Sequence, residues 1–277
     1  MLLALDIGNT NIVAGAWDGA RWETWRLSTQ RERTSDELAA FLKAAFELRG
    51  LGLSRFEGAI ISSVVPSLTP AAQEMCRKYL CLEPVTVGAE IDIGLKNLYD
   101  NPREVGADRL VNGVAAWAQF GCACVIADFG TATTVDAVSA RGEYLGGALA
   151  PGVGISTNAL FAAAARLPRV ERLELLRPPE TVLGRNTLHS IQSGILFGYA
   201  GLVKELVARC VEELKAAGEG RVVALATGGL AAVIAPLVPQ IEHVEPNLTL
   251  EGLRLIWTRN RPASSAASTE GKPQGKP

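Results

Sequence analysis

The chain has 277 residues, of which 48% are apolar and 20% charged, so it can bury a sizeable core in one large domain or two of moderate size. Its formal charge of −2 leaves no basic excess for a nucleic-acid backbone, and no apolar run is long enough to span a bilayer. We therefore expect neither a nucleic-acid partner nor a membrane protein.

The cysteines and histidines show no spacing that predicts chemistry. The five cysteines are odd in number and include no C-x-x-C pair, which argues against a disulfide framework or a zinc site. Cys122 and Cys124 alternate within an apolar strand, where small buried side chains are expected. His189 and His243 lie far apart in the sequence. Because the chain begins with a short strand-like segment and not with a secretory signal, we expect a cytoplasmic protein.

The first half of the chain alternates predicted strands and helices. Asp18-Gly19 is a strong hairpin signal between two apolar segments. The run from Thr34 to Glu37 has the pattern of a capping box, and an apolar stripe of helical spacing follows it. The predicted strands are 1–7, 12–17, 22–27, 56–65 and 84–87, and a second helix is predicted over 70–80.

The second half repeats this order, with predicted strands at 122–128, 133–139, 144–149, 222–226 and 241–244. Helices are predicted over 188–217, 230–237 and 249–257, and Pro151 is expected to start another, since proline is tolerated best at the first helical position. These patterns predict an α/β protein of two tandem halves, residues 1–118 and 119–258. Residues 259–277 are predicted to be a disordered tail, because from Pro262 onward there is no large apolar residue to bury.

Two matching turns are the first sign of function. Asp6-Ile7-Gly8-Asn9-Thr10-Asn11 follows the first strand, and Asp128-Phe129-Gly130-Thr131-Ala132-Thr133-Thr134 follows its counterpart in the second half. The glycine permits a tight turn whose N–H groups can surround phosphate oxygens, and the aspartate can hold a cation or its water shell. A single Asp-x-Gly is common turn chemistry. Two copies in matching strand–turn–strand contexts predict paired phosphate loops.

A third glycine-rich element, Thr227-Gly228-Gly229, lies between an apolar strand and a helix, where a nucleotide can approach a helix N-terminus. The P-loop and the G-x-G-x-x-G motif are both absent. The three elements resemble the two phosphate loops and the adenosine loop of the actin, Hsp70 and sugar-kinase superfamily. This resemblance implies two RNase H-like halves, each a mixed sheet flanked by helices.

The stretch from Tyr99 to Asn112 contains Gly106-Ala107-Asp108-Arg109 before a helix. By chemistry alone, an Asp-Arg pair here could equally be a helix cap with a salt bridge. However, together with the segment Asp6–Val13, the run Ser62-Ser63-Val64-Val65-Pro66 and the Asp128–Thr134 loop, it resembles type III pantothenate kinases across residues 1–257. Gly146-Gly147, Ala150-Pro151-Gly152, Asn186-Thr187 and Gln192-Ser193-Gly194 continue this match.

The resemblance implies phosphorylation of the terminal hydroxyl of pantothenate by ATP with Mg²⁺, in a homodimer. It implies that Asp108 is the proton acceptor, that Asp128 binds a monovalent cation (K⁺ or NH₄⁺), and that Asp6 is a possible Mg²⁺ ligand. The implied ATP-binding residues are Asp6, Ile7, Gly8, Asn9, Thr10, Asn11, Ile12, Val13 and Thr131. The implied acceptor-binding residues are Tyr99, Gly106, Ala107, Asp108, Arg109 and Thr187.

Two other functions stay open at this point. The same fold phosphorylates other small hydroxyl or carboxylate acceptors, because a fold alone does not settle function. A non-catalytic ATP-binding regulator is the second alternative, although the sequence has no basic stripe for DNA.

Overall fold

The computed structural model describes residues 1–164 and 176–261, in which two mixed β-sheets share one strand order. The first sheet has the order β3-β2-β1-β4-β5, and the second has the order β11-β10-β7-β8-β9-β6. In the first sheet, β1 pairs antiparallel with β2 and parallel with β4. In the second sheet, β7 pairs in the same way, antiparallel with β8 and parallel with β10. The predicted tandem repeat is thus confirmed at the level of topology.

The first-sheet strands are β1 (Leu2–Ile7), β2 (Asn11–Trp17), β3 (Trp22–Ser28), β4 (Gly58–Ser63) and β5 (Val85–Thr86). The second-sheet strands are β6 (Lys96–Asn97), β7 (Ala123–Phe129), β8 (Ala132–Val138), β9 (Glu143–Pro151), β10 (Val222–Thr227) and β11 (His243–Val244).

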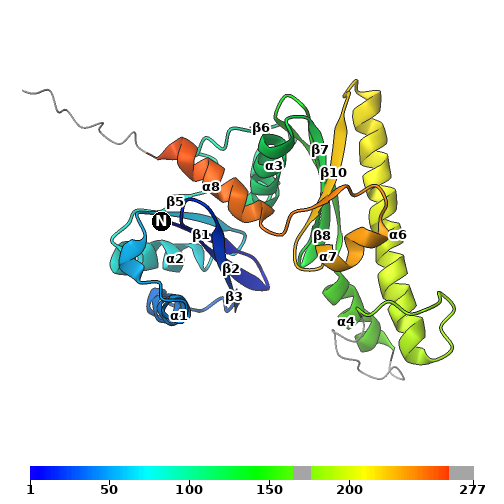
Figure 1. Cartoon of the computed structure of the whole chain (residues 1–277), viewed down its shortest axis with the longest axis horizontal. Helices are drawn as coiled ribbons and strands as arrows, with labels where there is room; N and C mark the ends of the chain where they lie inside the picture. The colour runs from blue at the N-terminus through cyan, green and yellow to red at the C-terminus, as the bar shows by residue number, and fades with distance from the viewer. Residues whose placement is uncertain (165–175, 262–277) are drawn as a thin grey trace, which may run out of the picture.

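Helices cover both faces of each sheet and form one layer between them (Figure 1). The middle layer consists of α3 (Ala107–Phe120) and α8 (Leu248–Asn260), which bury apolar side chains of both sheets. The outer face of the first sheet carries α1 (Ser35–Glu47) and α2 (Thr69–Met75). The outer face of the second carries α6 (Thr187–Ala216) and α7 (Ala231–Ile234), with α4 (Val153–Ala163) next to the start of α6.

The last helix joins the two halves of the chain. α8 follows the second sheet in sequence but packs on β1 and β4 of the first and on α3. A side chain at Gly252 would place its Cβ 2.1 Å from the Val111 carbonyl oxygen, so glycine permits the close approach of the two helices. Strand β6 precedes residue 118 but pairs with β9 of the second sheet. The boundary between residues 118 and 119 stays a prediction.

Local signals in the sequence were mostly reliable. The capping box of α1 is present, with the Glu37 N–H donating to Thr34 Oγ1 (3.3 Å) and the Thr34 N–H donating to Glu37 Oε2 (2.8 Å). The Asp18-Gly19 hairpin joins β2 to β3 as predicted, and Asp18 Oδ1 accepts hydrogen bonds from two following N–H groups.

The prediction for Pro151 was wrong. Pro151 is the last residue of β9, and α4 begins two residues later at Val153. A strand end tolerates the missing N–H of proline as well as a helix start does. The Pro151 carbonyl accepts a hydrogen bond from the Tyr199 hydroxyl (2.7 Å), which ties this strand end to α6.

Among the helices of the described ranges, none has the length and hydropathy to cross a membrane. The predicted disordered tail from Pro262 onward lies outside the described residues.

Candidate active site

The two predicted phosphate loops meet at one place. The first is the turn between β1 and β2, where the Gly8 N–H donates to the Asn11 carbonyl (3.0 Å) and Thr29 Oγ1 donates to the Gly8 carbonyl (2.6 Å). The second is the turn between β7 and β8. The hydroxyls of Thr10 and Thr131 lie 2.7 Å apart, although 121 positions separate them in sequence. Both threonines are exposed, so their turns face solvent from opposite halves of the protein.

Three carboxylates gather beside these turns: Asp6 near the end of β1, Asp108 in the first turn of α3, and Asp128 near the end of β7. Burial, and then the negative charges of Asp108 and Asp128, raise the pKa of Asp6 to about 7. Burial and the charge of Asp108 raise the pKa of Asp128 to about 7 as well. The pKa of Asp108 is also raised, mainly by burial. Because each anion disfavours the ionisation of its neighbours, the cluster favours a bound cation or protons.

This donor set fits a partly hydrated cation better than a closed metal cage. Within residues 1–164 and 176–261, no three Asp, Glu, His or Cys side chains converge closely enough to enclose a metal ion. Mg²⁺ at nucleotide sites usually keeps several waters and takes its other ligands from one or two carboxylates and the phosphates. Asp6 could hold such an ion through one of these waters.

Asp128 is held by a chain of polar contacts from the middle helical layer. Its Oδ2 accepts a hydrogen bond from Asn112 Nδ2 on α3 (2.9 Å), and Asn112 Oδ1 accepts one from Thr249 Oγ1 on α8 (2.7 Å). The hydrogen bond from Asn112 lowers the pKa of Asp128 and opposes the effect of burial. Neither Asn112 nor Thr249 was predicted. The only signal was an amide in a helix that otherwise buries apolar and small side chains.

The third glycine-rich element closes over the same carboxylate. Gly228, directly after β10, has a φ of +90°, and a Cβ there would lie 2.4 Å from Asp128 Oδ1. Only glycine combines this backbone conformation with so close an approach. The structure thus brings the three predicted nucleotide elements together around Asp128.

Asp108 and Arg109 do not form the salt bridge of the helix-cap alternative. Asp108 Oδ1 accepts a hydrogen bond from the Arg109 backbone N–H (2.8 Å), a local contact of the kind expected in the first turn of a helix. The Arg109 guanidinium turns instead to Asp136 in β8, with Nη2 and Nε at 2.6 and 2.8 Å from Asp136 Oδ1. Burial alone would lower the pKa of Arg109, but the hydrogen bond and charge of Asp136 raise it.

A polar pocket lies beside Tyr99. Its volume is about 470 Å³, and its lining residues are Leu98, Tyr99, Asp100, Asn101, Glu104 and Leu145. The Tyr99 ring lies 6.5 Å from the ring of Tyr144, which in turn lies 5.9 Å from the Arg109 guanidinium carbon. The structure therefore groups Tyr99, Gly106, Ala107, Asp108 and Arg109 in one region. Thr187 is exposed at the start of α6, and within the described part of the chain no hydrogen bond joins it to this group.

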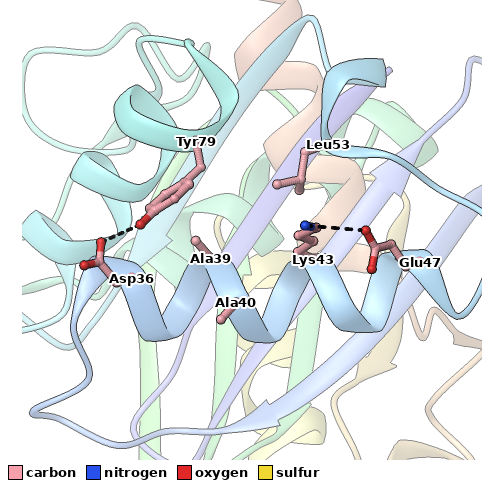
Figure 2. Close-up of a pocket in the computed structure, with 7 residues that line it drawn as sticks. All are labelled: Asp36, Ala39, Ala40, Lys43, Glu47, Leu53 and Tyr79. Atoms are coloured by element: carbon pink, nitrogen blue, oxygen red, sulfur yellow. Dashed lines mark hydrogen bonds and ion pairs between the residues drawn. The ribbon is translucent and has the colours of Figure 1, made fainter.

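A second pocket, of about 320 Å³, lies on the outer face of α1 and contains none of the predicted site residues (Figure 2). Its polar side chains pair with one another: the Tyr79 hydroxyl donates to Asp36 Oδ1 (2.7 Å), and Lys43 lies 3.8 Å from Glu47. With its charges already satisfied, this pocket offers no unpaired group for a ligand.

Comparison with known proteins decides between the families that this geometry allows. Residues 2–209 match the model of the family "Type III pantothenate kinase". The chain belongs to this family. It is 52% identical to the type III pantothenate kinase of Pelobacter propionicus, over 94% of this chain and 100% of that protein. It is 50% identical to that of Geobacter sulfurreducens, over the same shares.

The fold agrees with this membership of the type III pantothenate kinase family. The crystal structure of component A of the (R)-2-hydroxyglutaryl-CoA dehydratase of Acidaminococcus fermentans superposes with a TM-score of 0.50. It covers 92% of this chain and 95% of that one at 12% identity, a likeness that concerns the fold alone. The predicted fold class, two tandem halves that are each a mixed sheet flanked by helices, is confirmed.

Two of the buried cysteines are poor nucleophiles. Burial raises the pKa of the Cys76 and Cys124 thiols to about 12, so both stay protonated near neutral pH and are poor nucleophiles.

Proposed function

We propose that this protein transfers the γ-phosphoryl group of ATP to the terminal hydroxyl of pantothenate, the first step toward coenzyme A. The observation that carries the proposal is the position of Asp108. The charge of Asp108 acts on both Asp6 and Asp128 at the paired turns, and the next residue, Arg109, is linked through Tyr144 to Tyr99, which lines the polar pocket. Family membership supplies the identity of the acceptor.

Asp108 is proposed to orient the acceptor hydroxyl and to take its proton. The hydroxyl oxygen forms the new bond to the γ-phosphorus, the bond from that phosphorus to the β–γ bridging oxygen breaks, and ADP leaves. Phosphoryl transfer depends mainly on positioning and charge stabilisation, so a weak base is sufficient. The raised pKa of Asp108 brings this carboxylate closer to the operating pH, which favours general-base catalysis.

The nucleotide is proposed to lie between the two turns. Residues from Asp6 to Val13 and Thr131 would contact its phosphates, with the backbone N–H groups of the turns as donors. Bound Mg²⁺ would neutralise phosphate charge. Asp6 is the proposed carboxylate on its water shell, and Asp128 the proposed ligand of a monovalent cation (K⁺ or NH₄⁺).

A homodimer is part of the proposal. Large apolar side chains are exposed on the second half, on the outer side of β9, on α4 and just before α6. Exposed apolar residues that gather into a patch commonly mark a protein interface. The residues are Leu145, Leu149, Ile155, Leu160, Val182 and Leu183. The proposed compartment is the cytoplasm, and the five free thiols agree with a reducing environment.

The test is ADP release with a panel of acceptors. We expect turnover with pantothenate, dependence on Mg²⁺, and a faster rate in K⁺ than in Na⁺. Sugars and acetate, the acceptors of the alternative kinase function, should give only the background rate. ATP binding without ADP release, both with and without pantothenate, would instead favour the regulator.

A further inference from the structure

Asp136 is a buried charge that the proposed reaction does not use. It lies in the middle of β8 between Val135 and Ala137, and its side chain is only 1% exposed. An apolar residue at such a position usually serves stability at least as well as a buried ion pair. Its charge therefore calls for a role beyond the packing of the core.

Four contacts from three elements hold the Asp136 carboxylate. Its Oδ1 accepts hydrogen bonds from Arg109 Nε on α3 (2.8 Å) and from the Tyr144 hydroxyl on β9 (2.7 Å), and Arg109 Nη2 lies 2.6 Å from the same oxygen as an ion pair without hydrogen-bond geometry. Its Oδ2 receives the Thr134 hydroxyl from the same strand (2.9 Å). Opposite it in β9, a Cβ at Gly147 would lie 2.8 Å from Oδ1, so the neighbouring strand leaves room for the carboxylate. The carboxylate thus has one fixed orientation.

The same contacts fix the Arg109 guanidinium, whose side chain is 12% exposed. Nε donates a hydrogen bond to Asp136 and Nη2 forms an ion pair with it, but in the described part of the chain neither Nη2 nor Nη1 has a hydrogen-bond partner. Arg109 follows Asp108 directly and, through Tyr144, lies next to Tyr99. An arginine held on one edge presents its other edge in a defined direction, which favours recognition of a carboxylate or phosphate.

We propose that Asp136 is a positioning residue for the acceptor, which orients Arg109 toward the single anionic group of pantothenate, its carboxylate. This inference rests on the proposed function. Tyr144 and Thr134 act on Arg109 indirectly, because their hydroxyls hold the Asp136 carboxylate in the orientation that pairs with Arg109.

The test is steady-state kinetics of Asp136→Asn with pantothenate and ATP varied separately. Asparagine keeps the volume and one acceptor oxygen but loses the charge that holds Arg109. We expect the KM for pantothenate to rise on the order of ten- to a hundredfold, as a misplaced binding group would cause. The kcat and the KM for ATP should stay near wild type, since binding lost equally from ground and transition states changes KM alone. Asp92→Asn is the matched control, because Asp92 accepts Arg259 Nε at 2.7 Å in an exposed pair.

A double-mutant cycle separates positioning from a structural role. If Asp136 acts through Arg109, then adding Asp136→Asn to Arg109→Gln should not raise the pantothenate KM further. Tyr144→Phe and Thr134→Val are the second variants, each expected to raise the same KM by less if Asp136→Asn does not fold. An unchanged pantothenate KM in folded Asp136→Asn, or additive effects in the cycle, would overturn the inference while the proposed function stands. A wild-type protein that does not phosphorylate pantothenate would overturn both.

Discussion

Asp6 is a predicted site residue whose charged form destabilises the folded protein. Its pKa of about 7 lies above the usual value for an aspartate, so the folded protein holds a proton that the unfolded chain releases. Stability contributed by this proton is fully present below about pH 4 and is lost as the pH rises toward about 7. A charged Asp6 at pH 8 is therefore a cost that the folded state tolerates for function.

From this we expect Asp6→Asn to lose turnover and yet to melt at a higher temperature than wild type at pH 8. The difference in melting temperature should shrink as the pH is lowered toward 4, where wild-type Asp6 is protonated. Thermal melts from pH 4 to pH 8 measure this. Asp18→Asn is the control, because backbone hydrogen bonds from Arg21 and Ala20 lower the pKa of Asp18. It should show no gain, and a melting temperature of Asp6→Asn that follows Asp18→Asn would contradict the electrostatic account.

Gly228 offers a second test, of close approach at the nucleotide site. Gly228→Ala should lose activity and ATP affinity, because the new Cβ would lie 2.4 Å from Asp128 Oδ1. Gly218→Ala is matched to it, since Gly218 has the same φ of +90° and a Cβ there would meet no atom within 4 Å. Both variants carry the same backbone strain, so both should lose some stability. Nucleotide titration of the two variants distinguishes them, and equal ATP affinity would exclude a role for the contact between Gly228 and Asp128.

At the scale of elements, strands and turns were predictable where local chemistry alone decides them. The hairpin at Asp18 and the cap at Thr34 use contacts within a few residues, and both were predicted. Pro151 was assigned wrongly because a strand end and a helix start both tolerate a residue without an N–H donor, so the proline alone does not distinguish them. Strand β6 was missed because its two residues are ordered by pairing with β9, which lies far along the sequence, and not by their own pattern.

The residues of the candidate site also fall into those that the sequence predicted and those that it did not. Asp6 and Asp128 were predicted from their two matching turns, and Asp108 from the resemblance to type III pantothenate kinases. Asp136, Asn112 and Thr249 were not, because their partners come from elements that only the fold brings together. One signal was available for Asp136: it is the single charged residue of the predicted strand 133–139, and a charge requires a partner if such a strand is buried. The sequence did not show which residue that partner is.

The cap of α1 gives the prediction that belongs to this scale. Thr34→Ala should lower the free energy of unfolding by about 1 kcal/mol, the usual loss for an N-cap threonine. Because α1 lies on the outer face of the first sheet, kcat should be unchanged (Figure 1). Urea unfolding and the acceptor assay on the same preparation measure the two quantities. If kcat falls together with the free energy of unfolding, α1 takes part in the site.

For the whole molecule, the apolar surface of the second half predicts a dimer that a single charge can disrupt. Leu149 and Leu183 are 67% and 83% exposed, so a charge at either position costs little within one subunit. We expect Leu149→Asp and Leu183→Asp to shift the protein from dimer to monomer in light scattering after size exclusion. Leu48, 86% exposed directly after α1, provides the control, and Leu48→Asp should stay dimeric. A monomeric wild type, or a dimer in all three variants, would place the interface elsewhere.

Assignment of the reaction depends most directly on Asp108, the proposed proton acceptor, whose charge raises the pKa of both Asp6 and Asp128. The measurement is single-turnover formation of phosphopantothenate by Asp108→Asn, together with its ATP affinity and melting temperature. Glu90→Gln, the same change of acid to amide at an exposed position, is the control. We expect Asp108→Asn to lose on the order of 10² to 10⁴ in rate, as for removal of a positioned base, with ATP affinity and melting temperature close to wild type. A near-normal rate in a less stable protein would contradict the account and leave Asp108 as a helix cap.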